Sequence, residues 1–86
     1  MTTAVPSDQG VTVRYWAGAR AAAGVASDLV SGATVEDVVA AAVSLHPALR
    51  PVAAVATFLV DGSAANRYRP VPAGATVEVL PPFAGG

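Results

Sequence analysis

The chain ends in the run Pro81-Pro82-Phe83-Ala84-Gly85-Gly86, and the group there that could do chemistry is the terminal carboxylate. Proline fixes φ at about −65°, so the two prolines favour an extended path. Gly85 and Gly86 place no side chain beside the carboxylate. Six extended residues reach at most about 20 Å, enough to enter a narrow channel of another protein. We therefore predict that the reactive group is the Gly86 carboxylate; a frayed glycine end is the alternative.

The side chains offer no competing catalytic set. The sequence has no cysteine and no lysine, which excludes disulfides, thiolate metal sites, cysteine nucleophiles and Schiff-base lysines. The single histidine, His46, precedes Pro47 at the predicted end of a helix, and no metal-ligating residues recur at ligand spacing around it. No nucleotide-binding glycine motif or nucleophile elbow is present. We expect no metal site, no bound cofactor and no catalytic role for His46.

Length and charge narrow the class of protein further. The 86 residues suit one domain, which we place at residues 11–80, between a loose lead at residues 1–10 and an extended tail at residues 81–86. The net charge is −1, so no basic surface for nucleic acid is expected. No apolar run approaches the roughly 20 residues that span a bilayer, and residues 1–10 do not resemble a secretory signal. We expect a cytoplasmic protein that binds neither nucleic acid nor membrane.

Two alternating segments are the clearest strands, and they must hold the tail. Residues 11–17 alternate in a run rich in β-branched and aromatic side chains, with Val11, Val13 and Tyr15 on one face and Trp16 on the other. Residues 76–80 alternate in the same way and lead directly into the tail. Trp16 and Leu80 are the large apolar residues on the otherwise polar faces of these strands.

The main helix is predicted to begin after Thr34, a good N-cap, and to end near His46 because Pro47 disfavours helical geometry there. Glu36 and Asp37 place negative charge at the positive end of its dipole. Its apolar stripe is predicted to comprise Val35, Val38, Val39, Ala42 and Leu45.

The other segments complete a small mixed sheet. A helical turn at residues 19–23 ends at Gly24, and strands are predicted at residues 25–30 and 57–60, the latter running into an Asp61-Gly62 turn. Residues 63–73 are expected to be irregular, with at most one short strand. The first and last strands would then lie side by side in the middle of the sheet. The predicted fold is an α+β roll of the β-grasp, ubiquitin-like type, with one main helix on one face.

If the two central strands are neighbours, Trp16 and Leu80 share the sheet face that points away from the helix. Exposed aromatic and aliphatic side chains anchor protein interfaces. We predict that Trp16 and Leu80, extended by Leu59 and Phe83, bind a partner protein. In the alternative interpretation, the loop around residues 64–71 covers part of this face.

The sequence resembles the MoaD/ThiS group of β-grasp sulfur carriers, and most of all the MoaD type, the small subunit of molybdopterin synthase. The similarity runs from Val11 to Gly86, and its most specific part is the ending Leu80-Pro81-Pro82-Phe83-Ala84-Gly85-Gly86. It also includes the segments Val13-Arg14-Tyr15-Trp16-Ala17, Gly32-Ala33-Thr34-Val35 and Val60-Asp61-Gly62. Asp61 stands where some relatives have Asn, which does not affect the tail.

The resemblance implies a cycle in which the Gly86 carboxylate is activated, loaded with sulfur and returned after the sulfur is transferred. An E1-like, MoeB-type enzyme would use ATP to adenylate the Gly86 carboxylate, and a sulfurtransferase would supply the sulfur for a thiocarboxylate. The tail, from Pro81 through Ala84 to Gly86, would insert into a MoaE-like large subunit that carries the catalytic side chains, in a heterotetramer. The sulfur would go to a pterin precursor of molybdopterin. On this basis the chain is a sulfur-donor subunit and not an enzyme on its own.

Three alternatives remain open at this stage. The chain could carry sulfur for thiazole or cysteine synthesis, or be a ubiquitin-like modifier of other proteins. It could also be a plain binding module with an incidental tail.

Overall fold

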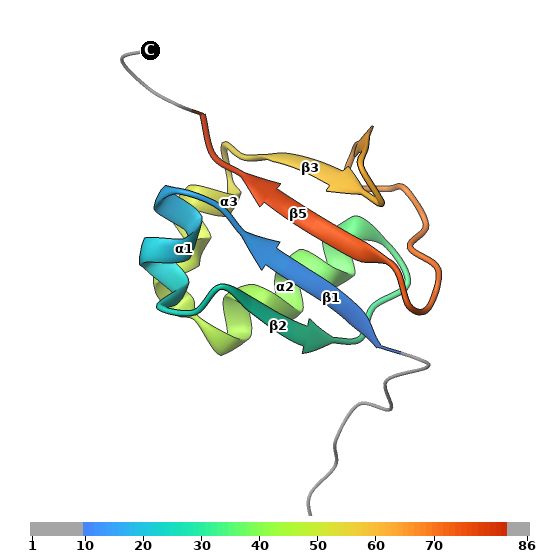
Figure 1. Ribbon diagram of the computed structural model, residues 1–86, viewed down its shortest axis with the longest axis horizontal. Coiled ribbons are helices and arrows are strands. Elements are labelled where there is room, and N and C mark those ends of the chain that lie inside the picture. Colours follow the sequence, from blue (N-terminus) through green and yellow to red (C-terminus); the bar gives the residue numbers. More distant parts are fainter. Residues whose placement is uncertain (1–9, 83–86) are drawn as a thin grey trace, which may run out of the picture.

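The computed structural model describes residues 10–82. Residues 1–9 of the lead predicted at residues 1–10, and the tail residues Phe83, Ala84, Gly85 and Gly86, lie outside the described residues. Within residues 10–82 the chain forms a sheet with helices packed on one of its faces (Figure 1).

The sheet has five strands in the order β2-β1-β5-β3-β4. Their bounds are β1 Val11–Tyr15, β2 Ser27–Val30, β3 Thr57–Val60, β4 Ser63–Ala65 and β5 Thr76–Leu80. The first and last strands pair in parallel at the centre, and every other pair is antiparallel. The predicted mixed sheet is therefore confirmed, with β4 as the one short strand in the segment expected to be irregular.

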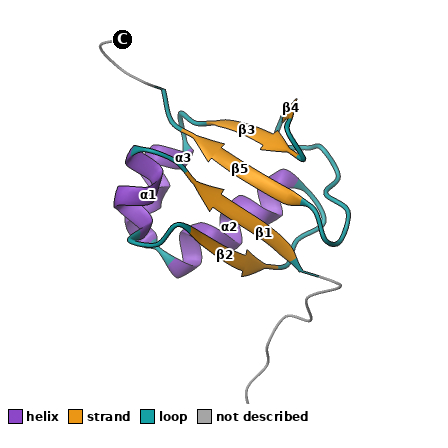
Figure 2. Ribbon diagram, in the orientation of Figure 1, coloured by secondary structure: helices purple, strands orange, loops and turns teal. Residues whose placement is uncertain are grey.

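The helices are α1 Gly18–Ala23, α2 Val35–Leu45, the 3₁₀ turn Pro47–Leu49 and α3 Arg50–Ala53. In Figure 2, α2 passes behind the strands, α1 lies beside their ends, and no helix lies in front of the sheet, so the other face is free of helices. As predicted, Thr34 caps α2: its hydroxyl accepts a hydrogen bond from the Asp37 backbone N–H at 3.2 Å. Asp37 returns the contact, because its carboxylate accepts the Thr34 N–H at 3.3 Å. This reciprocal capping box fixes where α2 begins.

The core between sheet and helices is made of apolar side chains, and none of the described polar or charged residues is buried with it. The inward residues of the central strands, Val11, Val13, Val77 and Val79, are almost fully buried. The α2 stripe holds for Val35, Val38, Val39 and Ala42. It was wrong for Leu45, which is 54% exposed in the last turn of α2, where the chain is about to turn away at His46.

Two glycines are required by geometry. Asp61 and Gly62 have φ of 47° and 85°, the paired positive values of a tight hairpin turn between β3 and β4. At Gly32, an added Cβ would lie 2.8 Å from the Val38 backbone nitrogen. Any side chain there would push the entry segment off the first turn of α2.

The strand predicted at residues 25–30 is shorter than expected, because β2 begins only at Ser27. Gly24 ends α1 with a left-handed φ of 77°, and the next residues complete the reversal before pairing starts. The loop after β4 packs against the start of α2: the Val35 N–H bonds the Arg69 carbonyl at 3.0 Å, and the Val71 N–H bonds the Ala33 carbonyl at 2.8 Å. The loop after β4 is therefore attached to the helical side of the molecule.

Candidate functional site

The tail at residues 81–86 is called the C-terminal arm below, and its base is held by the centre of the sheet. β5 is paired on both sides, with Val79 opposite Tyr15 of β1 and Leu80 opposite Thr57 of β3. Pro81 is buried and Pro82 is exposed, so the chain is still packed against the domain one residue beyond the strand. The predicted reactive residues, Gly85 and Gly86, lie beyond the described part of the chain.

Trp16 stands directly beside this base, on the open face. Its backbone N–H bonds the Val79 carbonyl at 3.2 Å, which continues the β1–β5 ladder by one residue. The indole Nε1–H donates to Glu78 Oε1 at 3.1 Å, and the Arg14 guanidinium carbon lies 5.0 Å from the centre of the tryptophan ring. The two charged neighbours therefore hold the indole in place by a hydrogen bond and a cation–π contact, while 39% of the residue stays exposed.

The backbone next to Trp16 is strained. Ala17 has φ 48° and ψ −123°, a conformation that residues with a side chain rarely adopt. Such strain costs on the order of 1–3 kcal/mol and is found where surrounding structure forces it. Here the chain must pass from the β1–β5 ladder, which ends at Trp16, to the start of α1 at Gly18 with only Ala17 between them, so the backbone turns sharply next to Trp16.

The structure brings Trp16, Leu59 and Leu80 to the same sheet face. Leu59 lies opposite Glu78 in the register, so both point to the side away from the helices, as does Leu80 two residues further on. Leu59 and Leu80 are half-buried. A fourth apolar residue, Leu29 of β2, is 45% exposed opposite Thr12 on this face and was not singled out from the sequence. That these residues bind a partner stays a prediction.

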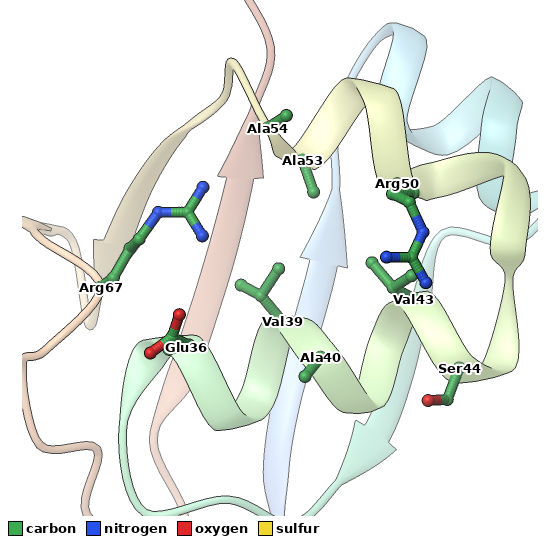
Figure 3. Close-up of a pocket in the computed structure, with 9 residues that line it drawn as sticks. All are labelled: Glu36, Val39, Ala40, Val43, Ser44, Arg50, Ala53, Ala54 and Arg67. Carbon is green, nitrogen blue, oxygen red and sulfur yellow. The ribbon is translucent and has the colours of Figure 1, made fainter.

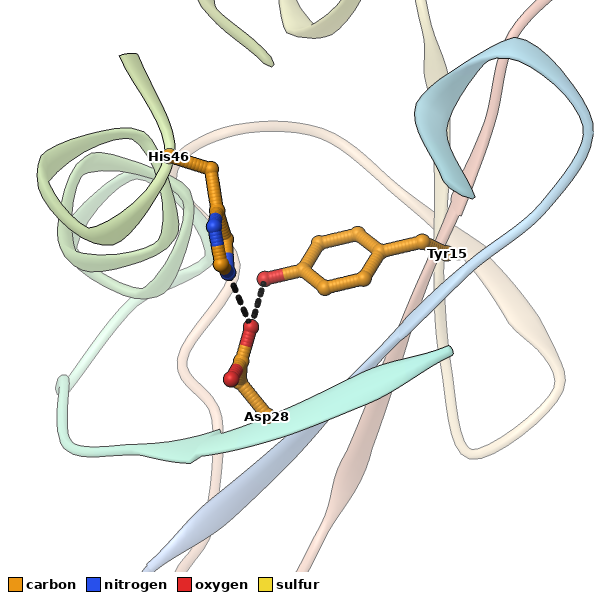
Figure 4. Close-up of polar contacts among 3 residues, drawn as sticks. All are labelled: Tyr15, Asp28 and His46. Atoms are coloured by element: carbon orange, nitrogen blue, oxygen red, sulfur yellow. Dashed lines mark hydrogen bonds and ion pairs between the residues drawn. The ribbon is translucent and has the colours of Figure 1, made fainter. Parts of the chain in front are cut away.

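On the other side of β1, three polar side chains meet under the end of α2 (Figure 4). The Tyr15 hydroxyl donates to Asp28 Oδ2 at 2.9 Å, and His46 Nε2 lies 2.6 Å from the same oxygen. The tyrosine and histidine rings meet edge to face, with centres 5.9 Å apart. Burial, and then the hydrogen bond and negative charge of Asp28, raise the pKa of the Tyr15 hydroxyl well above its usual value.

This cluster was missed in the sequence, since Asp28 is 13 residues from Tyr15 and 18 from His46. Only the pairing of β2 with β1 and the return of α2 bring the three together. The cluster links β1, β2 and the C-terminal end of α2. His46 does mark the helix end, as predicted.

Among residues 10–82, no three histidine, cysteine, aspartate or glutamate side chains gather as a metal site would require. None of the helices within that range is long and apolar enough to cross a membrane. What the described geometry offers is an open, partly apolar sheet face next to the firmly held base of the arm.

Solved structures with the same fold extend this picture. Small archaeal modifier protein 1 from Haloferax volcanii superposes with a TM-score of 0.83 at 27% identity, over 90% of this chain and 99% of that one. A protein described as molybdopterin converting factor subunit 1, from Pyrococcus furiosus, gives a TM-score of 0.76 at 25% identity, over 86% and 98% of the two chains.

A third structure shows the fold at lower identity. It is the complex of subunits 1 and 2 of molybdopterin-converting factor from Helicobacter pylori, in which the matching chain has a TM-score of 0.68 and 18% identity over 90% of this chain and 99% of that one. These similarities confirm the β-grasp, ubiquitin-like fold.

No curated protein matches the sequence significantly. The model of the ThiS family matches residues 13–86, which include most of β1, the central β5 and the whole arm to its last glycine. The chain therefore belongs to the ThiS family of ubiquitin-like sulfur carriers.

Proposed function

We propose that this protein carries sulfur as a thiocarboxylate on Gly86 and donates it to a pterin precursor of molybdopterin. The observation that carries the proposal is the family match, because it runs through the Gly85-Gly86 end and is not limited to the domain. The similarity to a molybdopterin converting factor subunit 1 at 25% identity favours this pathway within the family.

The proposed sulfur loading requires activation of the Gly86 carboxylate. A carboxylate is a poor electrophile, so one of its oxygens must first attack the α-phosphorus of ATP and expel pyrophosphate, which leaves an acyl adenylate. The terminal sulfur of a persulfide on the sulfurtransferase then attacks the carbonyl carbon, AMP departs, and an acyl disulfide forms. A thiol reduces this disulfide, which releases the thiocarboxylate and leaves the sulfurtransferase cysteine in a disulfide with that thiol. ATP is used by the activating enzyme, and we assign this chain no cofactor of its own. Two glycines at the end let a closed site surround the acyl group and keep water from hydrolysing it.

The partners follow from the same cycle. One is an E1-like, MoeB-type adenylating enzyme, one is a sulfurtransferase, and one is a MoaE-like large subunit that supplies the catalytic side chains. The Helicobacter pylori structure is a precedent for such a pair, because there subunit 1 is in complex with subunit 2. A heterotetramer with a dimeric large subunit is the assembly that we expect.

Removal of Gly86 tests the proposal. The full chain and the chain lacking Gly86 are each incubated with ATP, an E1-like activating enzyme and a sulfur donor, then examined by intact mass spectrometry. We expect the full chain to gain the mass difference between sulfur and oxygen and the shortened chain to gain nothing. Both should show the same thermal unfolding. Sulfur loading of the shortened chain would contradict the proposal.

A second function is favoured by one observation. The neighbour with a TM-score of 0.83 is a small archaeal modifier protein, and a modifier uses the same activated glycine to acylate an amine of another protein. Covalent adducts that survive denaturation and thiol treatment in cells expressing this chain would support a modifier. Sulfur transfer to a pterin precursor by the purified, loaded protein with a large subunit would support the proposed role, and transfer only to a thiazole precursor would place the chain in that pathway instead.

A further inference from the structure

The helical side of the molecule holds a groove that the sulfur chemistry does not use. It lies between α2 and α3, has a volume of about 340 Å³, and its floor is made by Val39, Val43 and Ala53 (Figure 3). Ala40, Ser44 and Ala54 complete the apolar and small lining. Figure 3 looks onto the groove with α2 in front of the central strands, so the groove lies on the helical side of the sheet, away from its open face.

Two arginines extend into the groove from opposite sides. Arg50 belongs to α3 and Arg67 follows β4, and Figure 3 shows both guanidinium groups directed over the apolar floor. Within residues 10–82, the only ion pair joins His46 and Asp28, so neither arginine has a carboxylate partner there. One carboxylate, Glu36, lines the groove on the side of Arg67 without forming an ion pair with it.

The backbone that carries these arginines is fixed. The Arg67 carbonyl accepts the Glu36 N–H at 2.8 Å, which ties the loop after β4 to the first turn of α2. The Arg50 carbonyl accepts the Ala54 N–H at 3.1 Å within α3. Only the arginine side chains would need to be ordered when a ligand binds, which lowers the entropic cost of binding.

We propose that the groove between α2 and α3 binds an acidic segment of a partner protein, whose carboxylates pair with Arg50 and Arg67 while its aliphatic side chains rest on Val39, Val43 and Ala53. A guanidinium binds a carboxylate through two parallel N–H bonds, which suits two unpaired arginines. The apolar floor between the arginines selects a peptide that carries aliphatic side chains between its acidic ones. Because the groove lies on the side away from the open sheet face, this contact leaves that face free.

The direct test is an NMR titration of the full chain with a synthetic heptapeptide in which leucine and glutamate alternate. We expect chemical-shift changes at the methyl groups of Val39, Val43 and Ala53 and at the arginine Nε–H groups of the groove. Binding should weaken as salt rises from about 0.05 to 0.5 M, because exposed charge pairs are screened.

Variants make the test specific. Arg50→Ala and Arg67→Ala should each weaken binding about two- to fivefold, and the double variant about tenfold. Arg20→Ala is the matched control, since it removes the same charge from α1 outside the groove, and it should leave affinity unchanged. Glu36→Gln should tighten binding about twofold, because it removes the one carboxylate that lines the groove. All variants are compared only after thermal unfolding shows that they fold.

Four outcomes would overturn the proposal. The first is that a peptide with lysine in place of glutamate binds as tightly as the acidic peptide. The second is that Arg20→Ala loses as much affinity as the groove variants do. The third is that inorganic phosphate alone causes the same chemical-shift changes, which would indicate a small-anion site. The fourth is a change in the groove signals when residues 83–86 are deleted without any peptide, which would make the chain's own tail the occupant.

Discussion

Tyr15 shows how a single side chain can serve both the core and a polar contact. Its ring is buried against the helices, while its hydroxyl reaches Asp28 at 2.9 Å. The alternation of residues 11–17 predicted the buried ring correctly. It could not predict the hydroxyl's partner, because that depends on which residue of β2 stands near the end of α2.

The raised pKa of Tyr15 predicts a loss of stability at alkaline pH. A group whose pKa is higher in the folded than in the unfolded state stabilises the fold fully below the unfolded value, here about 10, and this contribution is lost as pH rises through the folded value. The free energy of unfolding should therefore fall above about pH 10, by up to about 1.4 kcal/mol per pH unit. Urea denaturation between pH 7 and pH 11 measures this slope.

Tyr15→Phe is the matched variant. It should cost about 1–2 kcal/mol at neutral pH through the lost hydrogen bond to a carboxylate, and it should flatten the alkaline slope. The only other tyrosine is Tyr68, so the tyrosinate absorbance of Tyr68→Phe reports Tyr15 alone. Equal slopes for the wild type and Tyr15→Phe would show that another group governs alkaline unfolding.

At the scale of elements, local signals decided most of what could be predicted. Thr34 marks the start of α2, Pro47 marks its end, and Asp61-Gly62 marks the hairpin, because each of these depends only on the chemistry of adjacent residues. Leu45 shows the limit of periodicity: it continues the helical stripe in sequence, but the core does not extend beneath the last turn of α2. Periodicity also could not predict where β2 begins, because that depends on how many residues the chain uses to reverse direction after Gly24.

The capping box predicts a measurable contribution of Thr34 to stability. Thr34→Ala removes the acceptor of the Asp37 N–H at the start of α2 and should lower the free energy of unfolding by about 1 kcal/mol. Urea denaturation at neutral pH measures the change. Thr34→Ser keeps the oxygen and should lose much less; an equal loss in Thr34→Ser would mean that the methyl group, and not the cap, accounts for the effect.

At the scale of the whole molecule, the strand order determines where the arm begins. β5 lies between β1 and β3, so Leu80 and Pro81 leave the middle of the sheet and not a frayed edge. The same pairing places Trp16 beside that exit. The central position of the first and last strands was predicted from the order of the strands and the main helix along the sequence. The sequence could not predict the strained turn at Ala17 or the contacts of Arg14 and Glu78 with Trp16, because these depend on the register in which β1 and β5 pair.

This arrangement predicts that the open sheet face has a functional end and a neutral end. If a large subunit must receive the arm, its contacts should concentrate on the residues beside the exit, Trp16 and Leu80. Trp16→Ala and Leu80→Asp should then each weaken binding to a MoaE-like subunit about tenfold or more, since buried interface anchors carry about 2 kcal/mol each. Isothermal titration calorimetry with the purified subunits measures this.

Leu29→Asp is the matched control for Leu80→Asp. Leu29 is also a leucine exposed on this face, but it pairs opposite Thr12 near the start of β1, whereas Trp16 and Leu80 lie at the end where the arm leaves. The same change of charge and size should therefore alter affinity by less than about threefold, because contacts at the edge of an interface carry little energy. If Leu29→Asp weakens binding as much as Leu80→Asp does, the partner covers the whole sheet face. If neither variant matters, the partner recognises the arm alone, and the sheet face has some other use.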